Sequence, residues 1–107
     1  MIYFFVLLHN FQTMDADSIT SIDDARTFIS SKLTKAWEIY EEVYGPIGDM
    51  ATNYGDLFAC IDAIKALNDV VKINQSFEEC LACVEMVKQI WPIVEKLSAD
   101  PFVIIRD

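Results

Sequence analysis

Apolar residues recur at helical spacing in three stretches of the chain, separated by polar or turn-forming residues. In the first stretch, Ser21 and the acidic Asp24 three residues later form a capping-box-like start, which predicts a helix from near Ile22. Gly45 and Pro46 predict its end, because glycine accepts the left-handed conformation past a helix and proline cannot extend one. The expected apolar stripe consists of Ile22, Ala25, Ile29, Leu33, Ala36, Trp37, Tyr40, Val43 and Tyr44.

The second stretch predicts a helix that starts between Asp49 and Asp56. The apolar periodicity is clear from Leu57 to Ile73. Its wide apolar arc favours a central place in the fold. Asn68 interrupts this arc: it either fixes the register of helix packing or, as we expect, lies at the margin of the core and bonds to solvent or backbone. The apolar positions are Leu57, Phe58, Cys60, Ile61, Ala63, Ile64, Leu67, Val70 and Val71.

The third stretch opens with Ser76 and Glu79, a capping box that predicts a helix start at Phe77. Pro92 lies inside this stretch and predicts either a kink or a stop with a restart at Pro92, because proline donates no hydrogen bond and clashes with the carbonyl four residues earlier. The 3-4 spacing of the apolar residues is typical of near-antiparallel helix packing. These residues are Phe77, Cys80, Val84, Val87, Trp91 and Val94.

These elements predict an all-α fold, a small antiparallel helical bundle of three to four helices with short apolar ends that are non-helical or loosely packed. Residues 1–13 are expected to form an apolar N-terminal arm or a non-native start, with Met14 as the alternative start. Residues 14–101 form the helical bundle domain, and residues 102–107 form an apolar tail. Asp100 and Pro101 are typical of a domain boundary. They favour the interpretation that the tail is the beginning of a linker in a larger protein.

The N-terminal run MIYFFVLL is the one candidate targeting segment. It lacks the basic region and the small-residue cleavage site of a signal peptide. Its eight apolar residues are also far fewer than the roughly twenty needed to span a bilayer. We therefore expect both apolar ends to pack on the bundle, to pair with each other or to face a partner.

Composition and charge narrow the classes of function. A chain of 107 residues has room for one domain, and its 53% apolar residues exclude a disordered chain and leave apolar surface for a partner. Its formal net charge of −9 argues against nucleic acids and anionic membranes as ligands, because both attract positive charge. The acidic balance favours solubility or a basic partner.

The cysteines present the most tempting chemical motif. Cys80 and Cys83 form a C-x-x-C pair, but no βαβ pattern surrounds it, and the glutamates beside it would raise a thiol pKa. A zinc site needs four ligands, for which only Cys60 and His9 remain. We expect buried structural cysteines in a reducing, cytoplasmic compartment; a thiol redox or metal protein using Cys80 and Cys83 is the alternative.

Sequence motifs for catalysis are absent. The chain contains no G-x-G-x-x-G, P-loop, H-E-x-x-H or G-x-S-x-G motif. His9 has no serine, cysteine or acid placed to form a recognisable triad with it. We therefore expect no catalytic residues, no metal and no cofactor, and a protein that is not an enzyme.

Five aromatic side chains are the candidate interaction residues. We expect each to be a packing residue in the first place and to contribute to binding only where it is exposed. They are Trp37, Tyr40, Tyr44, Tyr54 and Trp91. The leading hypothesis is a non-enzymatic helical protein-protein interaction or oligomerisation domain, a piece of a larger signalling or scaffold protein, whose partner is another protein or its own copy. The alternative partner class is a basic protein, bound by an acidic inhibitor or nucleic-acid mimic; lysines scattered through the same helices argue against mimicry.

Two runs resemble segments of known helical proteins. Residues 36–45 (AWEIYEEVYG) and 87–97 (VKQIWPIVEKL) are similar to helices in the N-terminal bundles of fungal signal-transducing NTPases and in some tetratricopeptide proteins. Neither pattern is complete. The resemblance identifies no family and implies no function.

Overall fold

The computed structural model describes residues 18–102, with the side chain of Asp49 excepted. Three long helices, α2 (Ile22–Ile39), α3 (Tyr54–Ile73) and α4 (Phe77–Ala99), form this part of the chain together with the short π-helix η2 (Tyr40–Tyr44) and the 3-10 turn η3 (Gly48–Met50). No strand occurs within residues 18–102, so the expected all-α class is confirmed. Our expectations for the N-terminal arm, for Met14 as a start and for residues 103–107 lie outside the described residues.

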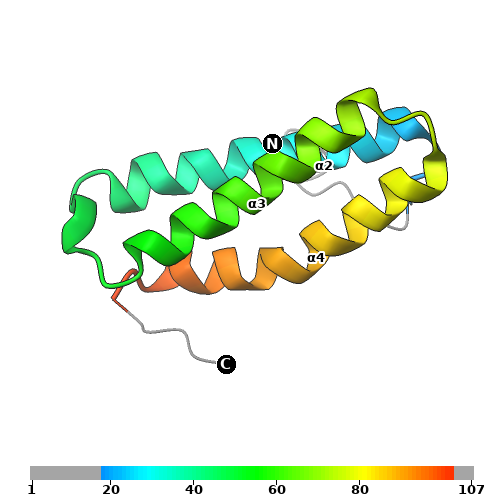
Figure 1. The fold of residues 1–107 in the computed structure, drawn as a ribbon. Coiled ribbons are helices and arrows are strands. Elements are labelled where there is room, and N and C mark those ends of the chain that lie inside the picture. The colour runs from blue at the N-terminus through cyan, green and yellow to red at the C-terminus, as the bar shows by residue number, and fades with distance from the viewer. Residues whose placement is uncertain (1–17, 103–107) are drawn as a thin grey trace, which may run out of the picture.

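The three long helices lie alongside one another, joined by connections at opposite ends (Figure 1). Each packs against both of the others. The second helix, α3, for which a central place was expected, thus shares the core with α2 and α4. Its outer face is open to solvent, and Val70, expected in the apolar arc, is 44% exposed.

The start of α2 is fixed by local hydrogen bonds, as the sequence predicts. The Ser21 hydroxyl accepts a hydrogen bond from the Asp24 N–H at 3.1 Å. The returning bond of the capping box is displaced by one residue, because Asp24 Oδ2 accepts from the N–H and hydroxyl of Thr20 at 3.0 and 3.1 Å. These bonds from Thr20 lower the pKa of the Asp24 carboxyl.

The start of α4 at Phe77 is also confirmed, and Asn74 strengthens it. Ser76 Oγ accepts from the Glu79 N–H at 3.3 Å. The amide of Asn74 bridges the two ends of this cap, accepting from the Ser76 N–H at 2.8 Å and donating to the Glu79 carboxylate at 3.0 Å. The turn between α3 and α4 is thus closed by side chains from within six residues of sequence.

The core is formed by one stripe of each long helix. The expected stripes are largely confirmed, except that Phe28 of α2 is buried although it was not expected there, and Trp37 of α2 lies at the edge with 39% of its surface exposed. In α4, Phe77 and Trp91 are half-buried. The largest of the fully buried apolar side chains are Tyr44, Ile29, Leu57, Ile61, Ile64, Leu97, Val71, Val84, Val87 and Val94.

The helical run ends at Gly45, as predicted, but in a different conformation from the one expected. The chain stays helical beyond Ile39 through the π-helix η2, where the N–H of Gly45 donates to the carbonyl of Tyr40 at 2.6 Å. Gly45 has φ −53°, so the expected left-handed cap at this residue is wrong; Gly48, with φ +54°, takes that conformation instead. Position 45 requires glycine because of crowding, since a Cβ there would lie 2.7 Å from the carbonyl oxygen of Glu41.

Pro92 does not divide the last helix. Of the two predicted alternatives, the stop and restart is wrong, because α4 is continuous from Phe77 to Ala99. Pro92 is exposed, as is Lys88, whose carbonyl loses its helical donor. Solvent can therefore take the place of the missing hydrogen bond.

Two glycines give a direct test of this account of Gly45. We expect Gly45→Ala to lower the free energy of unfolding by about 1–3 kcal/mol, the usual cost of overpacking, because the added Cβ meets the Glu41 backbone. Gly55→Ala, in the first turn of α3 with nothing within 4 Å of the new Cβ, should raise it by about 0.5–1 kcal/mol. Urea unfolding followed by circular dichroism measures both; stabilisation by both substitutions would contradict the crowding.

Candidate functional site

Four aromatic rings form a contiguous group between α2 and α3, which we call the aromatic cluster: Trp37, Tyr40, Tyr54 and Phe58. The Trp37 ring packs edge-on against Tyr40 at 5.7 Å between centroids and against Phe58 at 6.2 Å. Tyr40 lies 5.0 Å from Phe58, and Tyr54 lies 4.8 Å from it. These separations and tilted geometries are the ones aromatic pairs prefer.

Helical spacing on two elements produces the cluster. Trp37 and Tyr40 are three residues apart at the junction of α2 and η2, and Tyr54 and Phe58 are four residues apart at the start of α3. Trp37 is 39% exposed and the other three rings are half-buried. The cluster therefore joins the core on one side and presents aromatic surface on the other.

The rim of the aromatic cluster is acidic. Glu41 follows Trp37 by four residues and Asp62 follows Phe58 by four, so each lies one turn from a cluster ring, and both are exposed. At three or four residues on either side of the cluster rings, every position is neutral or acidic, with no lysine or arginine. The local charge thus matches the net charge of −9 of the whole chain.

Tyr44, also a candidate interaction residue, is fully buried and offers no surface to a partner. Its hydroxyl donates to the carbonyl of Leu97 at 3.0 Å. That carbonyl lies in the last turn of α4, where no helical N–H reaches it. Burial raises the pKa of the Tyr44 hydroxyl, and the charges of Asp100 and Asp56 raise it further.

Removing this hydroxyl tests its capping role. We expect Tyr44→Phe to lower the free energy of unfolding by about 1–3 kcal/mol, because the Leu97 carbonyl would stay buried without a donor. Tyr40→Phe is the matched control, since the Tyr40 hydroxyl makes no hydrogen bond to a described residue, and it should change stability by less than about 0.5 kcal/mol. Equal losses in thermal or urea unfolding would count against the cap.

Trp91 lies apart from the aromatic cluster, on the seam between α2 and α4. The Lys32 ammonium sits over its ring at 4.5 Å from the centroid, and 5.6 Å from the ring of Phe28. Burial lowers the pKa of Lys32, partly opposed by Glu95. The structure thus joins three of the five candidates, places Tyr44 in the core and Trp91 elsewhere, and adds Phe58, whose spacing from Tyr54 was the available signal.

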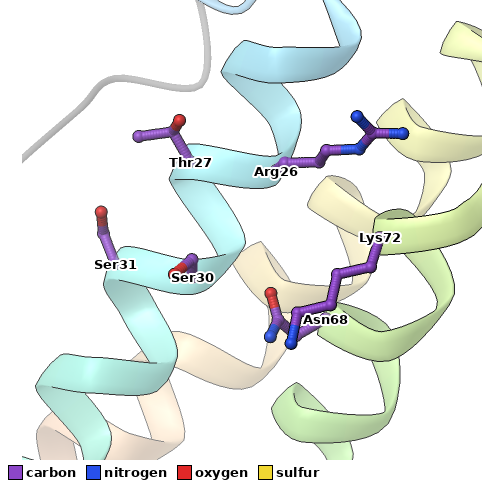
Figure 2. A pocket seen from close by; sticks show the side chains of 6 residues that line it. All are labelled: Arg26, Thr27, Ser30, Ser31, Asn68 and Lys72. Atoms are coloured by element: carbon purple, nitrogen blue, oxygen red, sulfur yellow. The ribbon is translucent and has the colours of Figure 1, made fainter.

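A second surface feature is a polar groove between α2 and α3, with a volume of about 320 Å³. Figure 2 shows its lining side chains, four from α2 and two from α3. They are Arg26, Thr27, Ser30, Ser31, Asn68 and Lys72. The lining holds two cations and no carboxylate.

Arg26 is occupied by the end of α3. Its Nε donates to the carbonyl of Val71 at 2.8 Å and its Nη2 to that of Asn74 at 3.1 Å, while Nη1 lies 3.5 Å from the Asp23 carboxylate. The guanidinium therefore satisfies carbonyls at a helix C-terminus, where positive charge is also favoured. In Figure 2 it points away from Asn68.

Asn68 is 6% exposed and opens onto the groove, which agrees with the expected place at the margin of the core. Of the two expected kinds of partner, solvent or backbone, the backbone is not used: the Asn68 amide bonds to none of residues 18–102. Lys72, one turn further along α3, extends toward Asn68 (Figure 2). Its ammonium forms no ion pair with a described carboxylate.

The cysteines are buried, as expected, and no disulfide joins them. Burial raises the pKa of the Cys83 thiol, with Cys80 and Glu79 adding to the effect, and burial together with Asp56 raises that of Cys60. Both thiols are therefore held in the neutral form, which is a poor nucleophile. Within the described range, no group of three or more His, Cys, Asp or Glu side chains could hold a metal ion.

Alkylation measures this protection. We expect iodoacetamide at mildly alkaline pH to modify Cys60, Cys80 and Cys83 slowly in the folded protein and quickly in urea, because burial limits access to all three and raises the pKa of the Cys60 and Cys83 thiols. Mass spectrometry of tryptic peptides assigns each site. Rapid modification of Cys80 or Cys83 without denaturant would instead support a reactive thiol pair.

Comparison of the chain with protein-family models, curated proteins and solved structures gave no match. None of the helices in the described range is long and apolar enough to cross a bilayer. The function must therefore be argued from the surface of the molecule.

Proposed function

We propose that this chain is a non-enzymatic protein-protein interaction domain, a small antiparallel helical bundle that binds a basic segment of another protein at the aromatic cluster. The observation that carries the proposal is the packing of Trp37, Tyr40, Tyr54 and Phe58 into one partly exposed group with an acidic rim. Tryptophan and tyrosine are enriched among the residues that dominate binding energy at interfaces.

The chemistry of the rim favours a basic partner. A lysine or arginine of the partner would meet Glu41 and Asp62 and could lie over the face of Trp37 or Tyr40 as a cation–π contact. Apolar side chains beside that cation would cover the remaining ring surface. An amphipathic helix with basic and leucine-like residues on neighbouring positions satisfies both demands.

Self-association through the same surface is disfavoured by charge. In a two-fold symmetric dimer the same patch is present on both copies, so the acidic rims would be brought together. Each copy also carries a net charge of −9. A partner of opposite charge avoids this repulsion and gains electrostatic steering.

Binding to a labelled amphipathic peptide of leucine, lysine and arginine tests the proposal. We expect saturable binding by fluorescence anisotropy. Trp37→Ala should weaken the affinity about tenfold or more, which corresponds to a loss of at least about 1.4 kcal/mol of binding free energy, because it removes an anchoring side chain. Met86→Ala, at a 52% exposed position on α4, is the matched control and should leave the affinity unchanged. Raising the salt concentration should weaken binding through screening.

The contrary outcomes are equally specific. Equal affinity of the Trp37→Ala and Met86→Ala proteins, both checked for helical circular dichroism, would exclude the aromatic cluster as the binding surface. Affinity that does not change with salt would exclude the acidic rim. A peptide of the same composition in scrambled order that binds equally well would reduce the interaction to unspecific charge attraction.

A further inference from the structure

We propose that the groove between α2 and α3 binds a small oxyanion, a phosphate or carboxylate group, through the Lys72 ammonium and the Asn68 amide. The groove is separate from the aromatic cluster, and this inference does not depend on the proposed interaction. Its volume of about 320 Å³ is at the lower end of the range of small-molecule sites, which restricts the ligand to a compact one.

The amide of Asn68 is the first indication of a ligand. Asn68 is 6% exposed as a residue, and its amide faces the groove, where water or a ligand is the available hydrogen-bond partner. Asn68 bonds to none of the described residues and lines the groove. A ligand in the groove supplies the partner that the protein does not.

The positive charge of the lining residues indicates that the ligand is negatively charged. Lys72 has no carboxylate partner in the described part of the chain, whereas Lys65 on the same helix pairs with Asp69 at 3.7 Å and Lys88 on α4 with Glu85 at 3.3 Å. In a chain with a net charge of −9, a groove that contains two cations and no acid is a local exception. A neutral polyol would leave the Lys72 charge uncompensated; an oxyanion pairs with it.

The two cations have different roles. Arg26 is held by Val71, Asn74 and Asp23, so its charge contributes to the local potential while its hydrogen bonds stay with the protein. Lys72 is the cation that remains for the ligand. Charge-assisted hydrogen bonds from an ammonium to an oxyanion are about twice as strong as neutral ones.

Three hydroxyls on α2 complete the lining. The side chains of Thr27, Ser30 and Ser31 form no hydrogen bond to another described residue, so the protein does not occupy these hydroxyls. They belong to the α2 wall of the groove, and in Figure 2 the Thr27 and Ser31 side chains extend away from Lys72 and Asn68.

Two-dimensional NMR of the ¹⁵N-labelled protein, titrated with inorganic phosphate and separately with succinate, tests this site. Sodium chloride at matched ionic strength and glycerol are the references. We expect saturable shifts of the Asn68 side-chain amide and of the Ser30, Ser31 and Lys72 backbone amides with at least one of the two oxyanions. The oxyanion that binds more tightly identifies whether the site prefers a phosphate or a carboxylate group. Lys72→Gln should weaken binding at least tenfold, and Lys65→Gln, the matched control, should not.

Asn68→Leu separates a binding role from a structural one. It removes the amide at similar side-chain volume, so we expect lost oxyanion binding together with a higher melting temperature in the absence of ligand. A lower melting temperature would show that Asn68 stabilises the fold and would overturn its assignment. Absence of saturable shifts with either oxyanion, equal shifts with glycerol, or equal binding by the Lys72→Gln and Lys65→Gln proteins would overturn the site.

Discussion

Carbonyl groups at the C-terminal ends of α3 and α4 accept hydrogen bonds from side chains of α2 and η2, and these bonds connect the three long helices. A helix leaves its last four carbonyls without helical donors. Arg26 of α2 supplies donors to the end of α3, and Tyr44 of η2 supplies one to the end of α4. These directional bonds link the C-terminal ends of α3 and α4 to the segment that runs from α2 into η2.

Both surface features of the molecule depend on this arrangement. The capping role of Arg26 leaves Lys72 as the cation without a protein partner in the groove. At the other end, the widened turn of η2 allows Tyr40 to join the aromatic cluster while Tyr44 enters the core. A π-helical turn is uncommon and frequently accompanies a functional site.

Sequence reasoning succeeded where the determining contacts are local. The starts of α2 and α4 follow from Ser21 and Ser76, whose partners lie three residues away. It located the end of the first helical run at Gly45 but not the conformation there, because a local pattern does not reveal the π-turn, whose Tyr44 bonds to a carbonyl 53 residues further along the chain. The apolar arc of α3 is narrower in the structure than in the sequence pattern, since Val70 is 44% exposed: burial depends on where neighbouring helices lie.

The candidate sites show the same difference between local patterns, which the sequence reveals, and contacts between distant residues, which it does not. The aromatic residues were identifiable by type, but their grouping was not, because Trp37 and Phe58 meet only when α2 and α3 pack. The groove was not foreseen at all. Arg26 acts on carbonyls 45 and 48 residues away, so no local pattern announces that it is occupied and that Lys72 is free of a protein partner.

The two tryptophans occupy contrasting surroundings, which has an optical consequence. Trp37 is partly exposed among neutral rings, whereas Trp91 is half-buried beneath an ammonium group. A cation held over an indole perturbs its excited state, so the intrinsic emission of the folded chain is the sum of two distinguishable sources. One source reports on the junction of α2 and α3 and the other on the seam between α2 and α4, and the protein therefore carries a separate internal fluorophore for each.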